Sequence, residues 1–498
     1  MQHILAIDQG TTGSTVLVLD EQLAVRGRGY REFAQHYPSP GRVEHDAAEI
    51  LASVRDAIAQ ALEQSGVAGT DLAAIGITNQ RETVVVWDRA TGEPVHRAIV
   101  WQDRRTQPMC RALRDAGHED EVRRRSGLVL DPYFSGTKIA WLLESEPTLR
   151  ARAEAGELAV GTIDTWLIAR LTDGAAHVTD PTNASRTLLF NLHEASWDAW
   201  ALDLLGVPQG ILPEVRPSSG HFGLSLGDHL GIEVPIQGVA GDQQAALFGQ
   251  GCWESGLAKN TYGTGAFLLL HTGDTAVPSE HGLLTTAACD ASGGLAYALE
   301  GSVFIAGAAI QWLRDELGLV SSAAESEAMA AALDDNGGVY FVPGFVGLGA
   351  PHWEADARGA LFGLTRGTSS AHIVRAALEA MAYGTTEVLR AMEADSGVVT
   401  SELRVDGGAS LNDWLMQFQA DVTHVPVRRP PMVETTALGA AGLAGLAAGV
   451  WASAEDFLGA QGDASRFHPG AASEERQMSM KGWDRAVRAS LAWARDEG

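Results

Sequence analysis

The chain has 498 residues, of which 45% are hydrophobic and 20% are charged. This length favours two domains, and this composition is typical of an ordinary soluble globular protein. The formal net charge is -27. Because such an acidic surface repels nucleic acid and anionic membranes, a small-molecule substrate is expected.

The cysteines give no sign of a disulfide framework or a zinc site. Cys110, Cys252 and Cys289 are widely spaced and form no CxxC pair, which favours reduced and mostly buried thiols. The N-terminus has no basic region followed by a long apolar stretch, so no signal peptide is expected. Both observations predict a cytoplasmic protein.

The first notable motif is a glycine-rich turn that follows an acid. The apolar run 4–7 ends at Asp8, and residues 9–13 contain two glycines and two threonines. One interpretation is a β-hairpin with a tight turn. The other is a phosphate loop, in which backbone N–H groups and the hydroxyls of Thr11 and Thr12 surround phosphate oxygens. An acid there would repel phosphate unless a cation such as Mg²⁺ lay between them. The turn alone leaves both interpretations open.

Helical patterns alternate with apolar strand patterns along the chain, which predicts an α/β fold. A first helix should follow Asp46, because Asp46 and Glu49 have capping-box spacing and Gly66 follows the last apolar position. A second amphipathic helix is predicted over about 371–392. The stretch 437–450 is too short to span a bilayer, and its small residues predict a helix packed closely inside the fold. Strands are predicted at residues 74–78, 83–87, 267–270, 339–342 and 403–405.

Two later turns resemble the first. Residues 262–265 form a glycine-threonine turn that leads into an apolar strand, and a further strand ends at Asp406 before two glycines. Because the strand-turn pattern of the N-terminus recurs here, we predict two related α/β domains, which meet near residue 250. Each turn alone is an ordinary structural feature, but the three together could line one nucleotide. Neither a P-loop motif nor a Rossmann glycine motif occurs, so those two nucleotide sites are excluded.

Eight motifs occur in order between Ile4 and about Trp483: DQGTTG, GITNQRETVVVW, AIVWQDRRT, DPYFSGTK, GDQQAALFGQ, NTYGTGAF, EGSVFIAGAAIQWLRD and RVDGGASLND. As a set they resemble the glycerol kinases of the FGGY carbohydrate kinase family. The resemblance implies an α/β protein with two actin-like, ribonuclease-H-like ATPase domains, 1–249 and 250–498, that flank a central cleft. It also implies ATP and glycerol as substrates, Mg²⁺ as cofactor, sn-glycerol 3-phosphate as product, and a homo-oligomer.

The same resemblance implies particular site residues. For glycerol they would be the polar residues Arg81, Glu82, Tyr133, Asp242 and Gln243, with Trp101 and Phe267 as apolar walls. For the nucleotide they would be Thr11, Thr12, Gly13, Thr264, Gly307, Gln311, Gly408 and Asn412. Asp8 matches the acid that lies on the metal side of the family's site.

These residue types suit the chemistry. Arg81 can donate from a planar fork while Glu82 and Asp242 accept, which pairs every hydroxyl of a small triol. Asp242 is the expected general base, because an alcohol proton is held too tightly to leave unaided as the oxygen attacks phosphorus. Without the other motifs, Arg81 with Glu82 would most often be a surface ion pair, and Asp242 a helix cap.

Two departures from the family pattern change the expectations. The family's first loop usually carries an arginine that reaches the phosphates, whereas this chain has Thr15 there, which predicts weaker nucleotide binding or a substitute cation. The loop 226–235 contains no arginine, so inhibition by fructose bisphosphate is not expected. The competing interpretations are a related kinase for a pentulose, erythritol or gluconate, and a non-catalytic actin-like ATPase. The pair Arg81–Glu82, with Trp101 and Phe267, favours glycerol.

Overall fold

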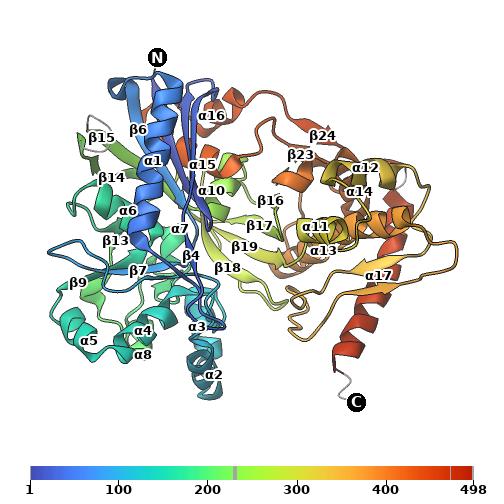
Figure 1. Cartoon of the computed structure of the whole chain (residues 1–498), viewed down its shortest axis with the longest axis horizontal. Coiled ribbons are helices and arrows are strands. Elements are labelled where there is room, and N and C mark those ends of the chain that lie inside the picture. Colours follow the sequence, from blue (N-terminus) through green and yellow to red (C-terminus); the bar gives the residue numbers. More distant parts are fainter. Residues whose placement is uncertain (1, 228–232, 472, 496–498) are drawn as a thin grey trace.

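The computed structural model describes residues 2–227, 233–471 and 473–495. Two α/β halves lie side by side (Figure 1), and we call residues 1–249 the upstream half and residues 250–498 the downstream half. Part of the loop for which no regulatory arginine was found, residues 228–232, lies outside the described residues.

A six-stranded sheet organises the upstream half. Its strands are β1 His3–Gln9, β2 Gly13–Asp20, β3 Val25–Glu32, β6 Leu72–Asn79, β14 Ser219–Ser225 and β15 Val234–Gly241. Their order is β14-β15-β6-β1-β2-β3. β6 is parallel to both β1 and β15, whereas β2 is antiparallel to β1 and to β3. Three parallel strands therefore end at the same edge of the sheet.

A seven-stranded sheet organises the downstream half. Its strands are β16 Leu257–Tyr262, β17 Ala266–Gly273, β18 Leu284–Cys289, β19 Leu295–Val303, β22 Glu402–Asp406, β23 Val427–Arg429 and β24 Ser465–Phe467. In the order β18-β19-β17-β16-β22-β23-β24, the last six repeat the upstream sheet, with β16 in the place of β1 and β22 in the place of β6. Every parallel or antiparallel pairing is preserved. The predicted pair of related α/β architectures is confirmed.

Both predicted amphipathic helices are present, the first with the expected boundaries and the second longer than predicted. α1, Ala47–Ser65, begins after Asp46, whose side chain accepts the N–H groups of Ala48 and Glu49, and it ends at Gly66, whose φ is 63°. It packs against β2 and β3. α13, Ser370–Ser396, is one turn longer than predicted, because the chain stays helical until Gly397 adopts a φ of 67°. The five predicted strands are also observed, each within three residues of its expected ends.

The remaining elements surround these two sheets. A second upstream sheet consists of β4 Gln35–His36, β5 Glu44–His45, β8 Ala98–Ile99, β7 Val84–Asp88 and β9 Leu158–Thr162. Further upstream elements are η1 Gly69–Asp71, α2 Gln107–Asp115, α3 Glu119–Ser126, α4 Ser135–Ser145, α5 Pro147–Glu154, α6 Ile163–Leu171, α7 Pro181–Ala184, α8 Ala199–Leu205, η2 Gln209–Ile211, α10 Asp242–Gly249 and the strand pairs β10 Val178–Thr179 with β13 Glu214–Val215 and β11 Phe190–Asn191 with β12 Ser196–Trp197. Downstream they are α11 Gly307–Asp315, α12 Ala323–Ala331, β20 Tyr340–Val342, β21 Ala360–Phe362, η3 Gly408–Leu411, α14 Asp413–Thr423, α15 Thr435–Ala448, α16 Ala454–Ala460 and α17 Ser473–Arg495.

α15 is the small-residue helix predicted to lie inside the fold, and it crosses between the halves. It belongs to the downstream half by sequence, yet it packs against β1, β6 and β15 of the upstream sheet and against α10 (Figure 1). Glycines permit this approach. A Cβ at Gly439 would lie 1.8 Å from the carbonyl oxygen of Ala245, and a Cβ at Gly76 would lie 2.2 Å from that of Ala440. A larger side chain at Gly439 would push α15 away from α10, and one at Gly76 would push α15 away from the sheet.

Two other expectations concern the whole chain. The cysteines are free and buried, as predicted. Over the described part of the chain, no helix combines the length and the apolar character needed to cross a membrane.

Candidate active site

The parallel strands of the upstream sheet bring distant site residues to one edge. Asp8 on β1 is in register with Thr78 on β6, and Thr78 is in register with Ala240 on β15. Arg81 and Asp242 follow the ends of β6 and β15 within two residues. Ligands of open α/β sheets bind at the carboxyl ends of the strands, so this edge is a candidate site.

The opening turn is a hairpin. β1 pairs with β2 in antiparallel register, and the N–H of Gly10 donates to the carbonyl of Gly13 at 2.9 Å. Thr11 is half-buried and Thr12 is exposed. A Cβ at Gly13 would lie 2.9 Å from the carbonyl oxygen of Arg31, so the close strand packing there requires glycine. The hairpin interpretation is confirmed, and phosphate binding by its turn is compatible with it and stays a prediction.

Asp242 and Arg81, predicted as base and substrate ligand, are in direct contact. Arg81 Nε lies 3.1 Å from Asp242 Oδ1, and the same oxygen accepts the N–H of Gln243 at 2.7 Å. The Asp242 side chain is 33% exposed, whereas that of Arg81 is 2% exposed. Asp242 is the first residue of α10 and Gly241 is its N-cap, so the expectation that Asp242 caps this helix is wrong. A carboxylate that solvent can reach, next to a buried guanidinium, remains available to a ligand.

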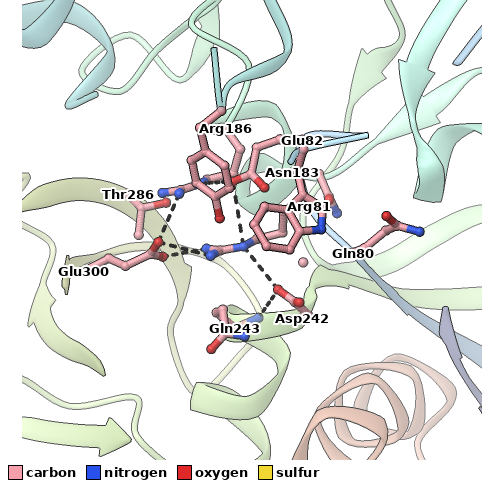
Figure 2. Close-up of polar contacts among 12 residues, drawn as sticks. Gln80, Arg81, Glu82, Asn183, Arg186, Asp242, Gln243, Thr286 and Glu300 are labelled. Carbon is pink, nitrogen blue, oxygen red and sulfur yellow. Dashed lines mark hydrogen bonds and ion pairs between the residues drawn. The ribbon is translucent and has the colours of Figure 1, made fainter. Parts of the chain in front are cut away.

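Four buried side chains form what we call the charge cluster: Arg81, Glu82, Arg186 and Glu300 (Figure 2). Glu300 accepts from Nη1 and Nη2 of Arg81 at 2.5 and 3.0 Å and from Nη2 of Arg186 at 3.0 Å. Arg186 Nε donates to Glu82 Oε1 at 2.7 Å. Burial raises the pKa of Glu300, but the charges of Arg186 and Arg81 outweigh it and lower the value to about 2. The alternative of a surface ion pair for Arg81 and Glu82 is therefore wrong.

An aromatic wall joins the predicted glycerol site to the opening turn. The Trp101 indole N–H donates to Thr11 Oγ1 at 3.0 Å, and its ring meets Tyr133 edge to face with centroids 5.6 Å apart. Burial raises the pKa of Tyr133, so the phenol stays a neutral donor. Phe267, the other predicted wall, is half-buried on β17 opposite Thr261 of β16.

Lys259 is a buried cation beside the predicted base. Its Nζ donates to Gln243 Oε1 and, at 2.9 Å, to Thr261 Oγ1. Burial lowers its pKa to about 8, although the charges of Asp406 and Asp242 act in the opposite direction. Lys259 therefore orients Gln243, which the resemblance assigns to glycerol. It also adds positive charge to a site that has Thr15, on β2, where the family usually has arginine.

The turns of the downstream sheet bring three of the predicted nucleotide residues, Thr264, Gly307 and Gly408, near one another. Thr261 on β16 is in register with Asp406 on β22, so the two turns that follow these strands are neighbours. The carbonyl of Thr264 accepts the N–H groups of Ala306 and Ala308 at 2.8 and 3.1 Å, which fixes this turn against Gly307 at the start of α11.

The other predicted nucleotide residues differ in their surroundings. A Cβ at Gly408 would meet no atom within 4 Å, so its backbone faces open space. Asn412 is the N-cap of α14, with its Oδ1 accepting the N–H of Leu415 at 2.8 Å, which leaves its amide N–H₂ for another partner. Gln311 is exposed on α11.

The surroundings of Asp8 fit a divalent cation. Burial raises the pKa of Asp8, and repulsion from Asp242 and Glu434 acts in the same direction, so that the pKa reaches about 7. A cation would relieve this repulsion, and carboxylate oxygens are the ligands that Mg²⁺ prefers. Among the described residues no group of three or more His, Cys, Asp or Glu side chains is arranged to hold a metal. One or two protein carboxylates are enough to bind Mg²⁺, because this ion keeps several waters and shares its coordination with substrate phosphates.

Sequence reasoning missed Arg186, Lys259 and Glu300. Lys259 and Glu300 are buried inside strands β16 and β19, directly after the apolar residues Ala258 and Leu299. A charged residue in such a strand must have a partner inside the protein. This pattern in the sequence could have identified both residues as buried and paired. Arg186 lies in a loop without regular periodicity, and its burial depends on contacts with distant residues.

Comparisons with known proteins agree with this architecture. The repeated sheet and the strand-end site define an actin-like, ribonuclease-H-like two-domain fold of the carbohydrate kinase class. Family models for the N-terminal and C-terminal domains of the FGGY family of carbohydrate kinases match residues 3–249 and 258–448. This chain belongs to the FGGY family of carbohydrate kinases.

Individual relatives narrow the comparison. The chain is similar to a glycerol kinase of Deinococcus radiodurans, with 57% identity over 99% of both chains. It superposes on a crystal structure of Plasmodium falciparum glycerol kinase with ADP at a TM-score of 0.93, with 35% identity over 99% of this chain and 98% of the other. A xylulose kinase from Lactobacillus acidophilus has a TM-score of 0.87 over 99% of both chains, but at 21% identity this similarity concerns the fold alone.

Proposed function

We propose that this protein transfers the γ-phosphoryl group of ATP to a terminal hydroxyl of glycerol, which gives sn-glycerol 3-phosphate and ADP. The contact of Arg81 with Asp242 at 3.1 Å carries the proposal, because it joins the predicted substrate ligand to the predicted base. The similarity to proteins named glycerol kinase supports glycerol as the acceptor, and the solved relative with ADP supports the nucleotide.

Glycerol recognition would use the buried polar residues as fixed partners. Arg81 would donate hydrogen bonds to hydroxyl oxygens, while the carboxylates of Glu82 and Asp242 would accept hydrogen bonds from hydroxyl groups. The Trp101 and Tyr133 rings would cover the C–H face of the ligand. A substrate that lacks one hydroxyl would leave a buried group unpaired, so it would bind poorly.

Asp242 would act as the general base. Its carboxylate accepts the proton of the terminal hydroxyl as that oxygen attacks the γ-phosphorus, and the bond between the γ-phosphorus and the bridging oxygen of ADP breaks. Arg81 keeps Asp242 in place through Nε, and Gln243 fixes the same carboxylate oxygen through its N–H. The base is therefore oriented before the substrate arrives.

The nucleotide would lie between the carboxyl ends of the strands of the upstream sheet and those of the downstream sheet. The turn at Thr11, Thr12 and Gly13 and the turn at Thr264 would offer backbone N–H groups to the phosphates, and Gly407 and Gly408 would admit the adenosine. Asp8 would hold Mg²⁺ directly or through water. When bound, this ion neutralises charge on the transferring phosphoryl group.

The test is ADP release by the purified full-length protein with Mg-ATP and a panel of glycerol, erythritol, xylulose and gluconate. Glycerol should give the highest kcat/KM, because the site pairs three hydroxyls. A preference for xylulose or another larger acceptor would overturn the assignment to glycerol. ATP hydrolysis that no polyol stimulates would favour the actin-like ATPase.

The resemblance also leads us to propose a homo-oligomer that works in the cytoplasm. Light scattering coupled to size-exclusion chromatography would measure the assembly, and a mass equal to the 52.6 kDa of a single chain would contradict it.

A further inference from the structure

Glu300 reaches from the downstream half into the predicted glycerol site. It lies on β19, where it pairs with Leu269 of β17 and Leu284 of β18. Its carboxylate contacts Arg81 and Arg186, which both belong to the upstream half. We propose that Glu300 is a positioning residue for glycerol binding: it fixes Arg81 directly, and Glu82 through Arg186, in the orientation that faces the substrate. This inference rests on the proposed function.

The hydrogen-bond donors of Arg81 show how Glu300 acts. A guanidinium has five N–H donors. Nη1 donates to Glu300 at 2.5 Å and to Gln244 at 3.2 Å, which uses both of its donors, and Nη2 gives one donor to Glu300 at 3.0 Å. The Nε donor and the second Nη2 donor remain, and Nε faces Asp242. Glu300 therefore takes the terminal edge of the guanidinium and leaves the other edge for Asp242 and the substrate (Figure 2).

Glu300 acts on Glu82 indirectly, through Arg186. Its Nη2 donates to Glu300 Oε1, which also accepts from Nη2 of Arg81, and its Nε donates to Glu82 Oε1 at 2.7 Å. The guanidinium also lies over the Tyr133 ring, 5.7 Å from the centroid. Glu82 has a φ of 62°, a strained conformation for a residue with a side chain, so its position depends on partners such as Arg186.

The charges alternate along this chain of contacts: Asp242, Arg81, Glu300, Arg186 and Glu82. Loss of the central acid would leave two buried arginines close together with no acid between them. Each would then turn toward the acid that remains, Arg81 toward Asp242 and Arg186 toward Glu82. Both movements would occupy carboxylates that the substrate needs.

Arg186 itself is held by the ends of the upstream strands. It follows α7, where Asn183 Oδ1 accepts from Asn79 of β6 at 2.9 Å and Thr182 Oγ1 accepts from the N–H of Gly241 at 2.9 Å. The two arginines are therefore attached to the upstream sheet, whereas Glu300 lies on a strand of the downstream sheet. Glycerol affinity should depend on how the two halves are placed.

The experiment compares full-length wild type with Glu300→Gln and Glu300→Asp. Calorimetry without ATP measures glycerol binding, and steady-state kinetics measure KM for glycerol and for ATP. For Glu300→Gln we expect the glycerol Kd and KM to rise about 10- to 100-fold, because charge-assisted bonds to two arginines are lost. The ATP KM should change less than about twofold. Glu300→Asp keeps the charge and should recover part of the glycerol affinity.

A matched control is Glu379→Gln. Glu379 is a buried acid of the downstream half that pairs with Arg375 at 2.8 Å, within α13. This variant loses the same charge from a buried ion pair and should leave both affinities unchanged while lowering the melting temperature.

Several outcomes would overturn the inference. They are wild-type glycerol affinity in Glu300→Gln, equal losses for glycerol and ATP, and a glycerol loss that Glu379→Gln reproduces. If Glu300→Gln does not fold, Glu300→Asp decides, because unchanged glycerol affinity in that variant contradicts a positioning role. A wild-type protein without glycerol-dependent ADP release would instead refute the proposed function.

Discussion

Asp8 and Thr15 are directly opposed across the antiparallel strands β1 and β2. Opposed residues of such a pair project from the same face of the sheet. The Thr15 side chain therefore lies beside the Asp8 carboxylate, at the edge where phosphate binding is proposed. A longer cationic side chain at residue 15 would reach the same space.

Thr15→Arg should strengthen nucleotide binding. A guanidinium near the phosphates would add charge-assisted hydrogen bonds, so the KM for ATP should fall up to about tenfold. Steady-state kinetics at saturating glycerol measure it. Thr15→Met adds similar length without charge and should not lower KM. Equal effects of both variants would show that bulk, not charge, is responsible.

Asp242→Asn should lose turnover while it keeps most of its glycerol affinity. An amide cannot accept the hydroxyl proton, so kcat should fall about 10²- to 10⁴-fold. ADP release at saturating substrates measures the change. Asp203→Asn, an exposed position on α8, serves as the control and should behave as wild type. If Asp242→Asn transferred the phosphoryl group at the wild-type rate, Asp242 would not be the general base.

Gly408→Ala should weaken nucleotide binding without loss of stability. Its Cβ would enter space that is open in the protein alone, and that space is where the adenosine is proposed to lie. We expect the ATP KM to rise several-fold and the melting temperature to stay unchanged. Gly459→Ala on α16 also places a methyl group in open space and should change neither.

Gly407→Ala should behave differently from its neighbour. Gly407 has a φ of 80°, and a Cβ there would lie 2.3 Å from the carbonyl oxygen of Tyr262. The substitution should therefore lower the free energy of unfolding by roughly 1 kcal/mol or more, as chemical denaturation would measure. If Gly407→Ala were as stable as Gly408→Ala, the close approach of the two turns would be wrong.

Asp164→Asn should change how stability depends on pH. Asp164 is buried, and burial together with repulsion from Asp180 raises its pKa to about 7 in the folded protein, although Thr162 and Thr179 donate to it. The folded state therefore holds a proton that the unfolded state releases near pH 4. The resulting stabilisation is complete below pH 4 and is lost as the pH rises to about 7.

The measurement for Asp164 is the free energy of unfolding of wild type and variant between pH 4 and pH 8. The wild-type value minus the variant value should fall by up to about 1.4 kcal/mol per pH unit between about pH 4 and 7. The exposed Asp203→Asn should show no such trend. A difference that rises with pH would contradict the sign.

Local patterns in the sequence predict much of the fold, because caps and periodicity act over a few residues. The Asp46 and Gly66 boundaries of α1 and the repeated strand-turn motifs are of this kind. The contact of Arg81 with Asp242 was expected only through family resemblance, since 161 positions separate them and their meeting depends on strand register. Glu300 and Arg186 were not predicted, because their roles arise from burial against residues more than 100 positions away.

The packing of α15 against β1 and β6 makes the two halves mutually dependent. A polypeptide cut near residue 250 would give a first fragment with an uncovered apolar sheet face and a second fragment with an unsupported helix. Neither fragment would have a complete hydrophobic core, so a gene that encodes only one of them should yield aggregated protein. Activity could return only when the separate fragments reassociate and that helix inserts in trans.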